Sequence, residues 1–187
     1  MSKPRVRIVI LCEDRAQQHF FRRLCERLDQ RVPRIKIAPR GQGSAEQWVR
    51  KHYPSEMQEY RRKRHELVGL LTAIDGDRYG PEMRKKSLDD ALLEAGFEVR
   101  QPEDRVAVCV PTWSIETWFA WLCALEEVDE LTQYKKDPAY KGAERDGSVS
   151  PTKAADRWFE GELPAEREQL PSLVDGRSEF ARLSGAE

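Results

Sequence analysis

Residues 6–14, VRIVILCED, and residues 67–77, LVGLLTAIDGD, decide the fold. Each stretch is a run of apolar and β-branched residues, which is typical of a strand buried in a parallel sheet. Each run also ends in acidic residues. We therefore expect two neighbouring buried strands whose carboxyl ends carry chemically active side chains.

The segments around these runs alternate between helix and strand. Helical spacing of apolar residues, punctuated by Pro and Gly, predicts helices over residues 15–28, 44–64, 81–96 and 113–125, and further strands over 33–38 and 106–110. Ser44 followed by Gln47 is a plausible capping box for the second helix. The alternation predicts an α/β fold, a parallel sheet flanked by helices. Residues 1–125 would form this domain, and 126–187 a helical C-terminal extension packed on it.

Composition limits the class of protein. The chain has 187 residues, of which 39% are hydrophobic and 35% charged. Its mean hydropathy is −0.75, and no apolar run approaches the roughly 18 residues of a membrane span. The N-terminal stretch MSKPRVRIVIL does not resemble a signal peptide. The four cysteines form no Cys-x-x-Cys pair and no zinc-ligand pattern. We therefore expect a cytoplasmic protein with no membrane partner.

Charge is distributed unevenly along the chain. Residues 1–70 hold 17 Lys and Arg against 8 Asp and Glu, whereas residues 71–187 hold 15 against 25. A basic half of this kind can neutralise nucleic-acid phosphates. A solvated helix face or an interface with an acidic partner explains it equally well.

Acidic residues follow three of the predicted strands. Glu13 ends the first run, Asp75 and Asp77 end the third, and Glu116 follows the fourth. Ligands of open parallel sheets bind beyond the carboxyl ends of the strands. Clustered carboxylates suit Mg²⁺ or Mn²⁺, which can activate water and stabilise charge on a phosphate. In extended backbone Asp75 and Asp77 point to one side and could share an ion, although a locally hydrogen-bonded turn is the alternative.

Three stretches, LCEDRAQQHFFRRL, LLTAIDGDRYG and VPTWSIETWF, resemble the TOPRIM domain of topoisomerases, bacterial primases and the overcoming-lysogenization-defect nucleases. The resemblance is closest to small stand-alone TOPRIM-like proteins of bacteria, which often accompany an ABC- or SMC-type ATPase in anti-phage systems. It implies that Glu13, Asp75 and Asp77 hold divalent metal and act in catalysis. It also implies a supporting role for Glu116.

The chain departs from that family at two positions. Gln17 stands where many nuclease-type relatives carry an acidic residue, which puts a second metal in doubt. Asp14 replaces the usual glycine after the first glutamate, and we interpret it as a helix cap rather than a ligand. Lys153 weakly resembles the C-terminal lysine of nuclease-type relatives, with Lys141 as a competitor.

Two further residues could contact a nucleic acid. Arg78, directly after the Asp-x-Asp, could reach a phosphate or pair with Asp75 or Glu116. Trp113 could offer a surface on which a base stacks.

The sequence thus predicts a Mg²⁺- or Mn²⁺-dependent nuclease that cuts DNA or RNA, an antiviral effector controlled by an ATPase partner. Glu13, Asp75, Asp77 and Glu116 would hold the metal, and Lys153 would assist catalysis. The alternative is a non-catalytic module that docks on the ATPase through its aromatic and acidic C-terminal region. Phosphotransfer, as in receiver domains, is a third reading, but the chain has Pro111-Thr112 where such domains place a lysine.

Overall fold

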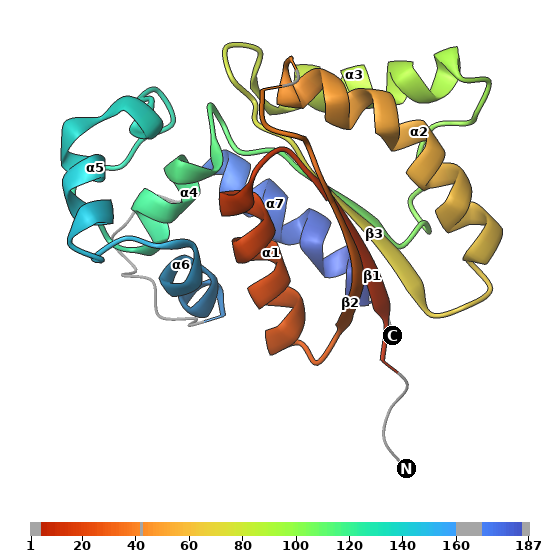
Figure 1. The fold of residues 1–187 in the computed structure, drawn as a ribbon, viewed down its shortest axis with the longest axis horizontal. Coiled ribbons are helices and arrows are strands. Elements are labelled where there is room, and N and C mark those ends of the chain that lie inside the picture. Colours follow the sequence, from red (N-terminus) through yellow and green to blue (C-terminus); the bar gives the residue numbers. More distant parts are fainter. Residues whose placement is uncertain (1–4, 42, 160–169, 185–187) are drawn as a thin grey trace.

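A computed structural model describes residues 5–41, 43–159 and 170–184. Its centre is a four-stranded sheet in which every pairing is parallel. The strands are β1 (Arg7–Cys12), β2 (Arg31–Ile37), β3 (Val68–Ala73) and β4 (Val106–Cys109), in the spatial order β2-β1-β3-β4. The α/β class and the parallel sheet predicted from the sequence are therefore confirmed (Figure 1).

Helices connect the strands and then continue to the end of the chain. The three crossover helices are α1 (Arg15–Arg27), α2 (Ala45–Lys63) and α3 (Gly80–Glu94). After β4 follow α4 (Ile115–Leu122), η1 (Tyr134–Lys136), α5 (Pro138–Arg145), α6 (Pro151–Trp158), α7 (Pro171–Ala181) and η2 (Arg182–Ser184). In the part of the chain that the structure describes, no helix is both long and apolar enough to cross a bilayer.

Several element boundaries differ from the prediction, and two of these differences have a clear structural cause. Strand β2 begins at Arg31 rather than Pro33, because the Arg31 N–H donates to the Val6 carbonyl at 2.9 Å and extends the ladder with β1. Helix α4 is shorter than the predicted 113–125. Trp113 and Ala124 have φ angles of +61° and +62°, which lie outside the helical region and bound the helix on both sides.

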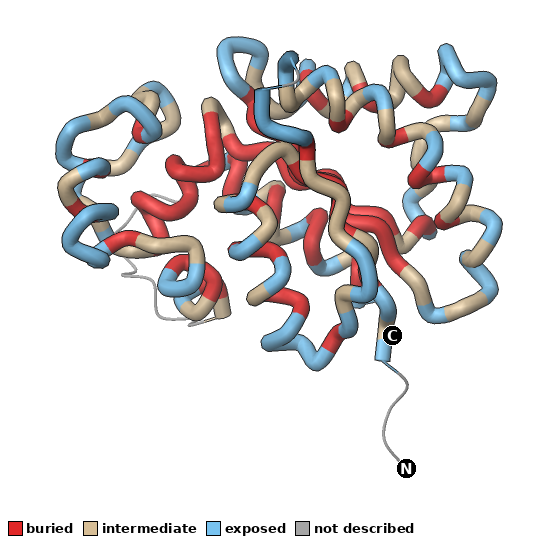
Figure 2. Tube along the Cα trace, viewed as in Figure 1, coloured by how far each residue is buried: buried red, intermediate tan, exposed pale blue. Residues whose placement is uncertain are grey.

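The sheet separates two apolar layers. Alternate strand residues face opposite sides, so Ile8 and Ile10 pack with α1, whereas Leu70 and Val106 pack with α2 and α3. Helices α4, α6 and α7 join the α1 side, where Trp118 is fully buried. Figure 2 shows the buried residues concentrated along the sheet and α4. Each large side chain buried in this way contributes about 2 kcal/mol to folding.

Asp14 begins helix α1 as the sequence predicted. Its Oδ1 accepts a hydrogen bond from the Gln17 N–H at 3.0 Å, and this satisfies one of the free amides of the first turn. Phe20, Phe21 and Leu24 then recur on one face and are fully buried. The cap fixes where the helix starts, and with it the direction in which Glu13 and Gln17 point.

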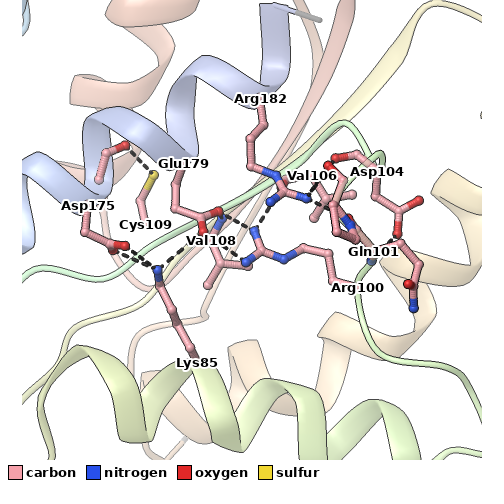
Figure 3. A network of polar contacts seen from close by, with 12 residues as sticks. Lys85, Arg100, Gln101, Asp104, Val106, Val108, Cys109, Asp175, Glu179 and Arg182 are labelled. Carbon is pink, nitrogen blue, oxygen red and sulfur yellow. Dashed lines mark hydrogen bonds and ion pairs between the residues drawn. The ribbon is translucent and has the colours of Figure 1, made fainter. Parts of the chain in front are cut away.

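Helix α7 closes the β4 edge of the sheet (Figure 3). The Glu179 carboxylate accepts a hydrogen bond from the edge-strand Val108 N–H at 3.0 Å and pairs with Arg100. Lys85 of α3 reaches Asp175 at 2.7 Å and Glu179 at 3.3 Å. The edge amide is thereby satisfied by a side chain instead of a fifth strand. Helix α7 is therefore joined by polar contacts to β4, to α3 and to the loop that connects them.

Candidate active site at the carboxyl edge of the sheet

Three predicted acidic residues meet beyond the carboxyl ends of the strands. Glu13 follows β1, Asp75 follows β3, and Glu116 lies in the first turn of α4, which follows β4. The Glu13 Oε1 atom accepts a hydrogen bond from the Asp75 N–H at 2.6 Å. Asp75 is also within electrostatic reach of both glutamates. Strands running in parallel bring these loops to one edge, as expected.

Asp75 is the buried centre of the site. Only 5% of the residue is exposed, and its Oδ1 accepts hydrogen bonds from Gln17 Nε2 at 2.7 Å and from the Ile115 N–H at 3.2 Å. Burial raises its pKa well above the usual range, and the charges of Glu13 and Glu116 add to the rise. A carboxylate in this position favours the approach of a cation or a proton.

Glu13 has a pKa close to neutrality. Burial raises the pKa of this carboxyl to about 7, although the hydrogen bond from the Asp75 N–H opposes the rise. The negative charge of Asp77 adds to it. A carboxyl group with such a pKa can accept and release a proton near pH 7, as general acid–base catalysis requires.

Asp77 does not continue the extended backbone of β3. The predicted geometry required extended backbone, but β3 ends at Ala73 and Asp77 has φ +47°, in the left-handed region. Its Oδ2 accepts a hydrogen bond from Arg84 Nη2 at 3.0 Å. Arg84 is buried and donates also to the Asp75 carbonyl at 3.1 Å. The extended backbone that we expected at Asp77 is therefore not what the structure has, and its carboxylate is held by Arg84.

Lys135, which no motif of the sequence singles out, lies beside the acidic cluster. Its Nζ lies 3.5 Å from Asp14 Oδ2 and 4.0 Å from Asp75 Oδ2. Burial lowers the pKa of Lys135, but the carboxylates of Glu116, Asp75 and Asp14 raise it more. Its only local signal is the adjacent pair Lys135-Lys136 in a loop-like segment, and such pairs are common on protein surfaces.

The two lysines suggested by sequence lie elsewhere. Lys153 is exposed in the first turn of α6, and its Nζ donates to the Gly147 carbonyl. Lys141 is exposed on α5. Within residues 5–41, 43–159 and 170–184, neither lysine forms an ion pair with the acidic cluster. The structure therefore brings Lys135, and not Lys153, to Asp75.

Glu116 carries a buried oxygen that is not hydrogen-bonded. The residue is 8% exposed, and its Oε2 has no hydrogen-bond partner among the described residues. Such an atom is costly unless a ligand or water satisfies it. As the side chains stand, no three His, Cys, Asp or Glu residues of the described chain form a ready coordination group. The donors nevertheless fit a hard divalent cation in kind, since all are carboxylate oxygens and one is unsatisfied.

A cleft of about 640 Å³ opens beside Asp77. Its walls come from the start of α2, the β3–α3 loop, the β4–α4 loop and η1. The lining residues include Glu46, Asp77, Arg78, Tyr79, Arg84, Trp113, Lys135 and Lys136. Arg78 donates to the Tyr79 hydroxyl at 2.7 Å, and it forms no ion pair with Asp75 or Glu116. Carboxylates, cations and an aromatic ring therefore meet at the same opening.

Much of the basic half of the chain is already paired with acidic residues. Arg23 and Arg27 contact Asp156, Arg34 and Lys36 contact Glu56, and Arg62 and Lys63 contact Glu59. Most of these basic side chains are partly exposed, where an ion pair contributes roughly 0–1 kcal/mol. The count of 17 Lys and Arg in residues 1–70 therefore overstates the number of basic side chains that are free to meet a phosphate.

Comparison of the chain with protein-family models, with curated proteins and with solved structures found no match.

Proposed function

We propose that the chain is a metal-dependent phosphodiesterase that cuts nucleic acid, with a TOPRIM-like site. The observation that carries the proposal is the buried Asp75 carboxylate, which lies within electrostatic reach of Glu13 and Glu116 and 4.0 Å from Lys135 Nζ. These carboxylates come from three separate strand ends. Carboxylate oxygens in this arrangement are the donors that Mg²⁺ and Mn²⁺ prefer.

Glu13, Asp75 and Glu116 would hold the metal, with Asp77 at the rim of the site. A bound divalent ion would supply an activated water and would stabilise charge on the phosphate. Glu13 Oε1 is occupied by the Asp75 N–H, so Oε2 is the atom that would face the metal.

Other residues of the site would position these groups or meet the substrate. Gln17 Nε2 holds the Asp75 carboxylate at 2.7 Å, and Arg84 holds the Asp77 carboxylate at 3.0 Å. The Lys135 ammonium would stabilise negative charge on the phosphate as the bond breaks. We assign to Lys135 the role that the sequence suggested for Lys153.

The test is a cleavage assay with Mg²⁺, Mn²⁺ or EDTA on plasmid, single-stranded DNA and structured RNA. We expect cutting that needs the metal and that is lost in Asp75→Ala. Lys153→Ala is the matched control and should cut like the wild type, since Lys153 contacts Gly147 and not the acidic cluster. Cleavage that persists in Asp75→Ala, or in EDTA, would overturn the proposal.

One observation favours a second function, a non-catalytic module that docks on an ATPase. Gln17 Nε2 donates a hydrogen bond to the Asp75 carboxylate, and the Lys135 ammonium lies 4.0 Å from it. The negative charge of the acidic cluster is therefore partly balanced without a metal. Docking through the aromatic residues is excluded for Trp118, Phe119 and Trp121, because each is at most 1% exposed. A folded chain that binds neither Mg²⁺ nor Mn²⁺ and cuts no substrate would favour this alternative.

The ATPase partner and the antiviral role rest on the family resemblance. An ABC- or SMC-type ATPase that binds the chain and changes its cleavage rate would support both. Metal binding and regulation are separate questions, because metal binding can be measured on the chain alone.

A further inference from the structure

We propose that the cleft beside Asp77 binds single-stranded nucleic acid, with one unpaired base stacked on Trp113 and the adjoining phosphates held by Arg78 and Lys136. The inference deepens the proposed nuclease function, because it names the form of the substrate. Its basis is the geometry of the cleft.

Trp113 adopts a backbone conformation that bulky residues rarely accept. Its φ angle is +61°, and the neighbouring loop residue Asp77 has φ +47°. The two loops are tied at this point, since the Asp77 N–H donates to the Trp113 carbonyl at 2.8 Å. Backbone strain of this kind persists where the surrounding structure imposes it, and it clusters at ligand clamps. The contact fixes Trp113 next to Asp77 at the wall of the cleft.

The indole ring of Trp113 is left without a partner. Among the described residues it makes no ring stacking, cation–π contact or side-chain hydrogen bond. Other tryptophans are engaged: Trp118 donates to Ser172 at 2.9 Å, Trp158 packs against Phe20, and Trp48 stacks on His52. Trp113 is half-buried and lines the cleft. A half-buried, unstacked ring in a polar cleft is suited to a flat apolar ligand such as a nucleobase.

The charges of the cleft favour phosphates next to that ring. Its two acidic lining residues, Asp77 and Glu46, are both paired with the buried Arg84, at 3.0 Å and 2.9 Å. Arg78 and Lys136 line the same cleft and form no ion pair in the described chain. Two basic side chains of the cleft, Arg78 and Lys136, are therefore unpaired in the described chain, whereas both of its acidic lining residues are paired. They can bind successive phosphates of a strand.

Stacking on Trp113 requires a base whose face is uncovered. In a duplex both faces of each internal base are covered by neighbouring pairs, whereas a single strand exposes them. The cleft volume of about 640 Å³ is that of a pocket for a ligand of small-molecule size, which matches a nucleotide or two. The geometry therefore favours a single strand over a duplex.

The test measures binding without cleavage. Wild-type chain in EDTA is titrated into fluorescently labelled single strands of DNA and of RNA, and into the matching duplexes. Trp113→Gly removes the ring and suits the positive φ, so the variant retains its fold. We expect it to bind single strands about tenfold more weakly, and duplexes as the wild type does. Trp113→Phe should keep most of the affinity, and Trp48→Phe, outside the cleft, should change nothing.

Two further arms identify the ligand. A fully abasic strand keeps its phosphates but offers no base, so wild type and Trp113→Gly should bind it equally. A free mononucleotide should compete much less well than a strand. The proposal is overturned if Trp113→Gly binds single strands like the wild type, if duplex binds as tightly, or if the mononucleotide competes equally.

The same samples separate this inference from the nuclease proposal. Metal-dependent cleavage with no effect of Trp113→Gly on binding would support the nuclease proposal and contradict the single-strand site. Binding that depends on Trp113, with no cleavage under any condition, would support the single-strand site and contradict the nuclease proposal.

Discussion

The side-chain amide of Gln17 donates a hydrogen bond to Oδ1 of Asp75 at 2.7 Å, and both residues are buried. The two are 58 positions apart in the chain. A neutral amide therefore contacts Asp75, the most buried carboxylate of the candidate site. An acidic residue in place of Gln17 would repel that carboxylate. The contact explains how Asp75 is tolerated in the interior, and it leads to a first prediction.

Gln17→Glu should destabilise the metal-free protein by about 2 kcal/mol, because a hydrogen bond becomes a repulsion between buried carboxylates. Mg²⁺ should restore more stability to this variant than to the wild type, since a further carboxylate strengthens the metal site. Urea unfolding with and without Mg²⁺ measures both effects. Gln18→Glu, one position along the same helix, is the matched control. Equal stability of the two variants would contradict the assigned contact.

Asp75→Asn should abolish cleavage and yet stabilise the metal-free protein by about 1 kcal/mol at pH 8. Burial and the nearby Glu13 and Glu116 raise the pKa of Asp75. A carboxyl group whose pKa is higher in the folded than in the unfolded protein makes the protein less stable as pH rises above the unfolded pKa. The charged form of Asp75 therefore lowers the stability of the protein at pH 8. Asparagine removes the charge and keeps an oxygen for Gln17. Thermal unfolding at pH 8 measures the effect, and a less stable variant would contradict the origin of the pKa shift.

Lys135→Met should lower the rate of cleavage about a hundredfold while leaving the chain folded, because the ammonium near Asp75 is lost. Lys136→Met should weaken substrate binding with a smaller effect on the rate. Lys141→Met is exposed and outside the site, and serves as the control. Single-turnover rates with saturating substrate separate the two effects. If Lys135→Met cleaves as fast as Lys141→Met, Lys135 does not stabilise charge on the phosphate.

Glu179→Gln should destabilise the chain by about 3 kcal/mol at pH 7, since Arg100 would lose its carboxylate partner and Lys85 would keep only Asp175 (Figure 3). Burial raises the pKa of Glu179, but hydrogen bonds from Arg100 and the Val108 N–H lower it more, and the net shift is downward. The stabilisation is therefore present above the unfolded pKa and is lost as pH falls through the folded value.

Urea unfolding of wild type and Glu179→Gln across pH 7 to about 3 tests the sign. The difference between them should shrink on the acidic side, where the wild-type carboxyl also becomes protonated. Glu94→Gln, at the exposed end of α3, is the control. A difference that stays constant with pH would exclude an electrostatic origin.

The sequence by itself determined the class of fold and the edge of the sheet that carries the acidic residues. Apolar β-branched runs predict buried strands, and parallel strands place Glu13, Asp75 and Glu116 at one edge. The cap at Asp14 was also legible, because capping depends on residues three apart. These features are local, so the pattern of neighbouring residues is sufficient to predict them.

Only the tertiary structure decided which side chains complete the site. Gln17 reaches Asp75, Lys135 enters from beyond α4, and Arg84 pairs with Asp77. These contacts join segments that are distant in sequence, or depend on one left-handed residue in a loop, and neither leaves a periodic signal. Local spacing determines helices and strands, whereas the position of a long polar side chain depends on which buried charge it can neutralise once the chain has folded.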